Sequence, residues 1–140
     1  MTTRGRPRNP RRETSGPPPV LWRITRVLAD RKAVDPIVLD VRGICSATDF
    51  FVIASGTSEA HVRGMADRLV DGRETGGERP HHVEGQAQGR WVLLDYVDVV
   101  THLFHPEQRE FYQLERLWSD APVLVPAEDG GPPRHGVVKG

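Results

Sequence analysis

Apolar residues in the middle of the chain recur with two different periods. Helical spacing puts one group on the inner side of a first predicted helix that ends near Lys32: Val20, Leu21, Ile24, Val27 and Leu28. A second predicted helix begins near Glu59, and its buried side consists of Val62, Met65, Ala66, Leu69 and Val70. The glycines at positions 72, 76 and 77 end this second helix.

Runs rich in β-branched and aromatic residues predict strands between and after these helices. Phe50–Ala54 is continuously apolar, which is typical of a central strand covered on both faces. Further strands are predicted at 37–41, 80–84, 91–96 and 99–104, the last two as a hairpin. The strand at 50–54, the second helix and the strand at 80–84 form a predicted βαβ crossover.

A last helix is predicted from His105–Pro106, with Pro106 at its first position. Its apolar side consists of Phe111, Leu114, Leu117 and Trp118. The whole order predicts an α/β domain with a mixed sheet of about five strands flanked by helices.

The two ends of the chain differ in composition from this middle. Residues 1–19 hold five arginines, five prolines and almost no large apolar side chain, so we expect a disordered basic arm. Residues 122–140 are rich in proline and glycine and predict a flexible tail. The foldable domain is therefore expected at residues 20–121.

The formal net charge of zero conceals an uneven distribution. The arm carries five arginines against one glutamate, whereas residues 20–121 carry twelve basic and sixteen acidic side chains. A domain with a balance of −4 is poorly suited to grip nucleic acid through a broad basic face, but it suits a basic protein partner. The arm is either a solvated tail or a non-specific contact to RNA phosphate.

Several segments in the predicted domain resemble, in order and spacing, the Iojap-like ribosomal silencing factor family. They are Val38–Val41, Thr48–Ser58, His82–Gly85, Trp91–Tyr96 and Arg109–Trp118. The resemblance runs from about Val20 to Ala121. Several separate motifs in register are more specific than any one of them.

This resemblance implies a nucleotidyltransferase-like fold without catalytic residues and without a cofactor. It implies a translation repressor that binds the large ribosomal subunit through ribosomal protein number fourteen and sterically blocks joining of the small subunit. It also implies a homodimer off the ribosome and a bacterial cytoplasmic location, or a mitochondrial or plastid one in a eukaryote. No apolar run reaches membrane-spanning length.

Two positions depart from the family pattern. Val97 stands where many relatives have glycine in the turn Asp95–Asp98, and a β-branched residue fits a positive φ poorly. Gly72 and Arg73 stand where relatives continue the second helix, so we expect this helix to end early.

Residues Ser55–Ser58 form the main candidate for chemistry, because they link a strand to a helix start that can hold a phosphate. The alternative function is therefore a nucleotide-binding or degenerate nucleotidyltransferase-like protein. A transferase needs converging acids on Mg²⁺, and Asp95 and Asp98 only flank a turn. Helix capping by this loop is the simpler interpretation.

No metal site or nucleophilic arrangement is predicted. The six histidines and the one cysteine, Cys45, show no zinc-ligand spacing, and no disulfide is possible within the chain. We expect His102 to be a polar residue on a half-buried sheet face, hydrogen-bonded to a hairpin neighbour, and His105 to cap the last helix.

Acidic and aromatic residues on the hairpin and on the last helix are the candidate partner contacts, because interfaces favour tryptophan, tyrosine and arginine anchors with charges for steering. They are Trp91, Asp95, Tyr96, Asp98, His102, Arg109, Glu110, Tyr112, Glu115 and Trp118. For Trp91 and Trp118, a place in the core is an equal alternative.

Overall fold

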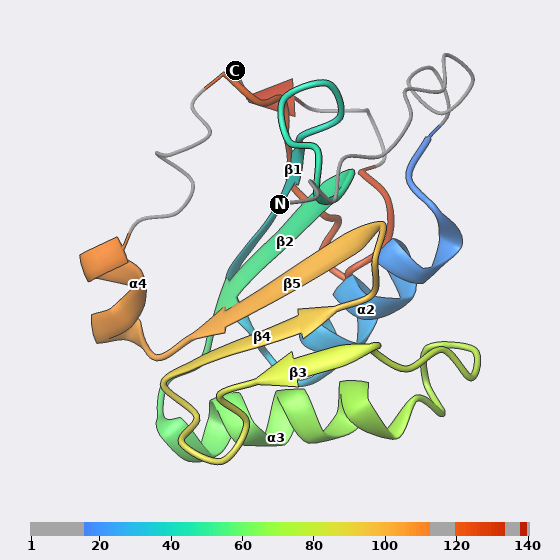
Figure 1. The fold of residues 1–140 in the computed structure, drawn as a ribbon. Coiled ribbons are helices and arrows are strands. Elements are labelled where there is room, and N and C mark those ends of the chain that lie inside the picture. The colour runs from blue at the N-terminus through green and yellow to red at the C-terminus, as the bar shows by residue number, and fades with distance from the viewer. Residues whose placement is uncertain (1–15, 113–119, 134–137, 140) are drawn as a thin grey trace, which may run out of the picture.

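The computed structural model describes residues 16–112, 120–133 and 138–139 (Figure 1). Its helices there are α2 (Pro19–Asp30), α3 (Glu59–Asp71) and α4 (Pro106–Tyr112). Its strands there are β1 (Val34–Asp40), β2 (Phe50–Ser55), β3 (His82–Glu84), β4 (Trp91–Asp95), β5 (Val99–Phe104), β6 (Val123–Leu124) and β7 (Val138–Lys139). These strands form one mixed sheet in the order β3-β4-β5-β2-β1-β6-β7.

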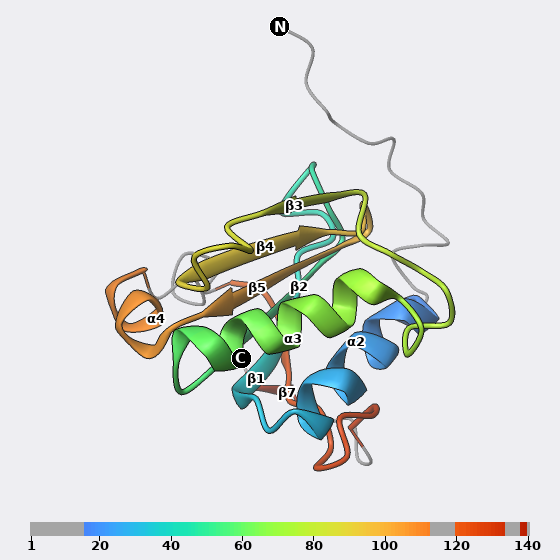
Figure 2. The ribbon, with the colours of Figure 1, turned by 90° about the horizontal axis from the view of Figure 1, so that it is seen from below.

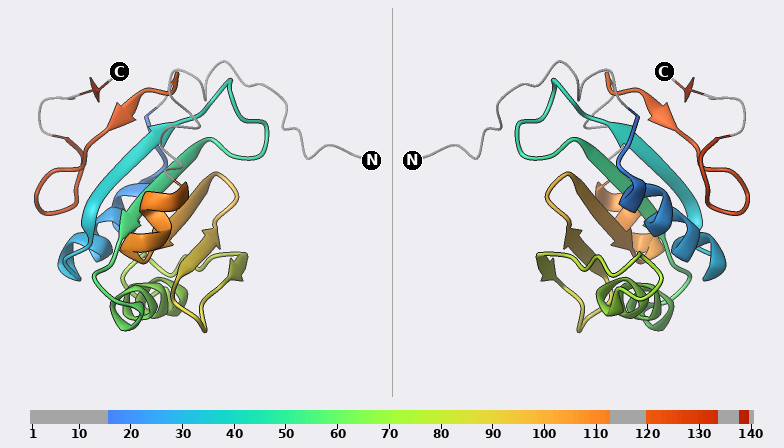
Figure 3. Two further views of the ribbon diagram at one scale, coloured as in Figure 1. Left: turned by 90° about the vertical axis from the view of Figure 1, so that its left-hand side faces the viewer. Right: turned by 90° about the vertical axis from the view of Figure 1, so that its right-hand side faces the viewer.

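Helices α2 and α3 lie on the same face of the sheet (Figures 2 and 3). The sequence defines both ends of α3: the Ser58 side chain accepts the His61 N–H at 3.0 Å, and Gly72 closes the helix with φ of 80°. Helix α2 has Pro19 in its first turn, where the missing N–H costs nothing. The end of α3 at Asp71, directly before Gly72, confirms that the glycine cluster ends this helix.

The centre of the sheet is the parallel pair β2 and β5, and the other neighbouring strands are antiparallel. The predicted βαβ crossover exists, because β2 leads through α3 to β3, which runs in the same direction. The two strands are not neighbours, however, since β4 and β5 lie between them. The chain therefore crosses under the sheet to its edge and returns through β4 to the centre.

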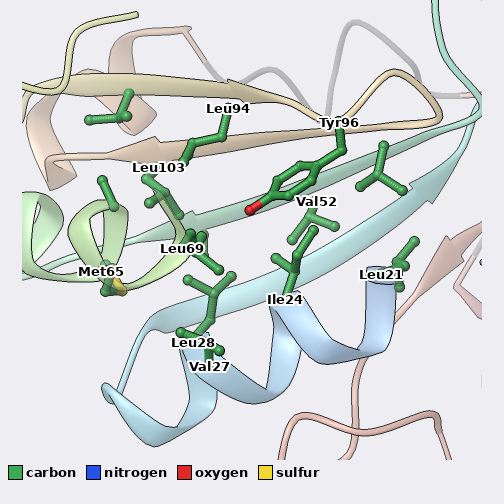
Figure 4. Close-up of a cluster of buried hydrophobic side chains, with 14 of the residues drawn as sticks. Leu21, Ile24, Val27, Leu28, Val52, Met65, Leu69, Leu94, Tyr96 and Leu103 are labelled. Carbon is green, nitrogen blue, oxygen red and sulfur yellow. The ribbon is translucent and has the colours of Figure 1, made fainter. Parts of the chain in front are cut away.

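The main core lies between the sheet and the two helices (Figure 4). Alternate residues of the strands contribute to it, together with the inner sides of α2 and α3. Its largest fully buried members include Phe50, Leu21, Ile24, Leu28, Met65, Leu69, Leu94 and Leu103. The apolar positions predicted for the first two helices are confirmed, with Val70 only half-buried.

The predicted α/β class and mixed sheet are confirmed, and β1–β5 correspond to the five expected strands. Two more strands, β6 and β7, come from residues 122–140, which the sequence assigns to a tail. Residues 123–124 therefore belong to the sheet, while the domain boundaries after residues 19 and 121 stay predictions. None of the helices in the described ranges has the length and apolar character needed to cross a membrane.

The turn between β4 and β5 contains a strained residue. Val97 has φ of 77°, the left-handed region that a β-branched side chain disfavours, and its side chain is 44% exposed. Its N–H donates to Asp95 Oδ1 at 2.7 Å, and the Asp98 N–H donates to the Tyr96 carbonyl at 3.0 Å. The hydrogen bonds of the turn thus hold valine in a conformation that suits glycine.

We expect Val97→Gly to raise the free energy of unfolding by about 1 kcal/mol. The left-handed conformation costs an L-residue roughly 1–2 kcal/mol, and the greater entropy of unfolded glycine offsets part of the gain. Urea denaturation measures the change. Val34→Gly is the matched control, because Val34 is similarly exposed at 37% but has no positive φ, so that its replacement should destabilise. A loss of stability in Val97→Gly would contradict the strain.

Candidate functional site

Strand register defines a second face of the sheet, opposite α2 and α3. Residues paired across neighbouring strands share a face, and the pairs Leu93↔His102 and His102↔Ile53 continue across β4, β5 and β2. The next row contains Trp91↔Phe104. We call this side the aromatic face; its aromatic members are Phe51, Trp91, His102 and Phe104.

His102 contacts each of the other three rings of the aromatic face. His102 meets Phe51 edge-on with a centroid distance of 5.2 Å and stacks on Phe104 at 6.1 Å. The Trp91 ring lies 5.2 Å from the Phe104 ring. Phe104 is fully buried beneath the cluster, whereas Phe51 and Trp91 are only half-buried. These two rings therefore present aromatic surface to the solvent. Rigid aromatic surface of this kind is typical of protein interfaces.

His102 is held in one neutral form at the centre of the cluster. Trp91 Nε1 donates a hydrogen bond to His102 Nδ1 at 3.1 Å, so the ring proton of neutral His102 belongs on Nε2. Burial lowers the pKa of His102 to about 4, because the charged ring would lose its hydration. The predicted hydrogen bond between His102 and a hairpin neighbour is confirmed.

Acidic side chains border the aromatic face at its β3 edge. Glu84 is on this face because it pairs in register with Leu93, the partner of His102. Asp95 is on it too, because its partner Val100 also pairs with Phe51. Glu84 is exposed and bonds His82 Nε2 at 2.6 Å. An apolar centre with an acidic edge is complementary to a basic protein surface with apolar anchors.

The candidate contacts predicted from the sequence fall into different places. Trp91, Asp95 and His102 share the aromatic face, and Asp98 lies half-buried in the hairpin turn. Arg109 of α4 lies at the end of the sheet opposite the hairpin turn, where its Nη1 donates to Val34 O at 3.2 Å and Ser55 Oγ at 3.1 Å. Ser55 is in the same row as Phe104 and Trp91, so Arg109 adjoins the aromatic face. His105 caps α4, as predicted, by accepting the Glu107 N–H on Nδ1 at 3.3 Å.

The prediction of Tyr96 as a partner contact is wrong. Its side chain is 6% exposed and belongs to the main core, on the face opposite Trp91 and Asp95 (Figure 4). It alternates with Val92 and Leu94, and strand alternation turns all three toward the helices. Tyr96 is therefore unavailable as a surface contact in this fold.

The remaining candidates lie on or beyond α4. Glu110 and Tyr112 are within the helix, but the structure does not describe their side chains. Glu115 and Trp118 lie outside the described residues. Their role as contacts stays a prediction, as does the choice between core and surface for Trp118.

Trp91 of β4 lies between core and surface: it is half-buried and packs against the second apolar cluster of the molecule.

Residues missed by the sequence interpretation complete the aromatic face. From the sequence, Phe51, Phe104, Glu84 and Leu93 are predicted only as strand residues and not as contacts. Their common signal is period-two phase relative to Trp91 and His102. That signal becomes usable only when the pairing of the strands is known.

Two backbone amides of the Ser55–Ser58 loop are engaged in hydrogen bonds within the domain. The Gly56 N–H donates to Phe104 O at 2.9 Å, and the Thr57 N–H donates to His61 Nδ1 at 2.9 Å. A Cβ on Gly56 would lie 2.8 Å from Val62 Cγ2, so glycine here permits close packing of loop and helix. Two amides that could hold a phosphate are thus engaged, and helix capping accounts for the loop.

The described residues contain no group of three histidine, cysteine or acidic side chains that could hold a metal ion. Cys45 is a free, half-buried thiol beside the second apolar cluster. Asp95 Oδ1 is engaged by the Val97 N–H of the turn. Within the described ranges, this geometry supports a binding surface and shows no assembled catalytic group.

Comparisons with known proteins agree on one family. A family model described as "Ribosomal silencing factor during starvation" matches residues 15–136. The chain is 42% identical over 95 residues to the ribosomal silencing factor of Halalkalibacterium halodurans, covering 68% of this chain and 81% of that protein. It is 34% identical over 99 residues to the mouse protein named "Mitochondrial assembly of ribosomal large subunit protein 1", covering 69% and 43%.

A solved structure shares the fold. The crystal structure of a Chromobacterium violaceum protein superimposes with a TM-score of 0.67 at 31% identity, covering 71% of this chain and 83% of that one.

Proposed function

Because the chain belongs to the ribosomal silencing factor family, we propose that it binds the large ribosomal subunit and sterically blocks joining of the small subunit. The proposed target is ribosomal protein number fourteen, and the proposed effect is repression of translation. The observation that carries the proposal is the aromatic face with its acidic edge, which offers anchors and steering charges to a basic ribosomal protein. The name of the mouse relative supports the choice of the large subunit.

The proposed role requires only that the domain occupies its binding surface on the large subunit, and it requires no catalysed reaction. A domain with a balance of −4 would be steered toward basic protein and repelled by bare RNA. We therefore propose a non-enzymatic protein of the bacterial cytoplasm, or of an organelle if the source is eukaryotic. Homodimerisation off the ribosome and a contact of the basic arm with ribosomal RNA belong to the same proposal.

Co-sedimentation tests this proposal. The purified chain should pellet with isolated large subunits and not with small subunits or joined ribosomes. Adding it to a mixture of both subunits should reduce the amount of joined ribosome in proportion to the occupied large subunits. Binding to none of the three particles would refute the proposal, and binding without reduced joining would refute the blocking mechanism.

The double variant Glu84→Lys with Leu93→Ser should bind large subunits at least tenfold more weakly. It reverses an edge charge and removes apolar surface from the aromatic face, and about 1.4 kcal/mol corresponds to tenfold in affinity. The matched control is Asp67→Lys with Val70→Ser, which makes the same change of charge with a similar apolar loss on α3. Equal affinities of the two folded variants would move the contact away from the aromatic face.

A further inference from the structure

The segment after Ala121 adds a strand to the outer edge of β1 (Figure 1). Leu39 pairs with Val123 and Val38 with Leu124, and the Asp40 N–H donates to Pro122 O at 3.0 Å. An unpaired edge strand leaves backbone groups that can pair with other chains. Here β6 of the same chain pairs with these groups of β1 at Val38 and Leu39.

The two residues of β6 face opposite sides of the sheet. Leu124 packs against the main core, whereas Val123 is a half-buried member of the second apolar cluster. The same cluster contains Trp91 and Phe51, the two half-buried rings of the aromatic face. Val123 therefore packs against the same buried residues as the two rings, among them Leu39 and Ile53.

A tight turn fastens this segment to α2. The Gly130 N–H donates to Ala127 O at 2.8 Å, and the Ala127 N–H donates to Gly131 O at 2.9 Å. The hydroxyl of Thr25, which is 1% exposed, donates to Gly130 O. The turn therefore docks on the helix through a buried hydrogen bond.

Only glycine fits at position 130. Its φ is 86°, and an added Cβ would lie 2.6 Å from Arg26 Cα and closer still to the Thr25 carbonyl oxygen. These are backbone atoms of a packed helix, which cannot move aside as a flexible side chain can. A side chain at 130 must lift the turn from α2.

We propose that residues 122–131 form a strap that belongs to the large-subunit contact surface, with Val123 as a contact and Gly130 as its positioning residue. The inference rests on the proposed function. The proposed occupant is the same as that of the aromatic face, an apolar and basic ribosomal protein surface, because Val123, Trp91 and Phe51 are half-buried members of one apolar cluster. Strands lie roughly 4.8 Å apart, so β4 and β6 are about 19 Å apart, within the span of one protein interface.

The test compares two alanine variants. Gly130→Ala should weaken binding to large subunits at least fivefold and should increase hydrogen exchange at Val123 and Leu124. The control is Gly77→Ala, because Gly77 has the same φ of 86° with nothing within 4 Å of the added Cβ. Both variants carry the strain of a left-handed alanine, and only one displaces the strap.

A second variant separates contact from stability. Val123→Ser should weaken binding to a similar degree without raising hydrogen exchange at Gly130 or in α2, because it removes apolar surface and leaves the turn docked. Wild-type chain that binds large subunits while all three variants bind equally well would overturn the strap's role. Wild-type chain that fails to bind would instead overturn the proposed function. Unchanged exchange of β6 in Gly130→Ala would overturn Gly130 as its positioning residue.

Discussion

Tyr96→Ala should lower the free energy of unfolding by about 3–5 kcal/mol, the range for removing a large buried aromatic side chain. The ring lies in the main core among Val52, Leu94 and Leu103 (Figure 4). Its loss leaves a cavity between the sheet and the two helices. Chemical denaturation with a two-state analysis measures the change.

Tyr96→Phe provides the contrast. The Tyr96 hydroxyl is buried and has no hydrogen-bond partner among the described residues. An unsatisfied buried hydroxyl costs roughly 1–3 kcal/mol, so its removal should leave stability unchanged or raise it by about 1 kcal/mol. If Tyr96→Ala costs less than 1 kcal/mol, Tyr96 is at the surface and the core assignment is wrong.

The ionisation of Tyr96 offers an independent check. Burial raises the pKa of its phenol, and the charge of Glu78 raises it further. The chain has two tyrosines, so Tyr112→Phe leaves Tyr96 as the only phenol to follow by absorbance. Its absorbance should change only when the domain unfolds at alkaline pH. A titration near the ordinary tyrosine pKa in folded protein would contradict burial.

Local signals in the sequence were sufficient to predict α2, α3 and the strands β1–β5. The helix spacing from Val20 to Leu28, the Ser58 cap and the Gly72 end are all interactions between near neighbours, and the structure contains each of them. Val97 is a similar case, because the turn Asp95–Asp98 needs a positive φ whatever the rest of the domain does. These features depend on a few consecutive residues, which the sequence displays directly.

The placement of Tyr96 was an error of interpretation. Its alternation with Val92 and Leu94 already indicated the inner face. The polar hydroxyl and the nearby turn suggested a surface contact instead. A tyrosine buries most of its area as a hydrophobic ring, so phase along the strand is the stronger signal.

The features that the sequence could not predict all depend on distant pairing. β6 is two residues long and lies between prolines, so its own composition predicts a tail, and only its register with Val38 and Leu39 makes it a strand. The Thr25–Gly130 hydrogen bond joins residues 105 positions apart. The aromatic face likewise exists only because β5 lies between β4 and β2.

Lowering the pH from about 6.5 to 4 should cost the domain about 3 kcal/mol through His102 alone. The folded-state pKa of His102 is about 4, against an ordinary value of 6.5. Above 6.5 the ring is neutral in both states, and the full stability is present. Between these two values the unfolded chain binds a proton that the folded chain excludes, so stability falls by about 1.36 kcal/mol per pH unit.

His102→Gln isolates this contribution, because glutamine cannot titrate but its carbonyl oxygen can accept the hydrogen bond from Trp91 Nε1. The free energy of unfolding of both proteins is measured by urea denaturation from pH 7.5 to 4. Carboxylates titrate in both proteins and cancel in the difference. That difference should shift by about 3 kcal/mol in favour of the variant as the pH falls. A difference that stays constant with pH would mean that His102 is hydrated in the folded state, and that the rings of the aromatic face do not enclose it.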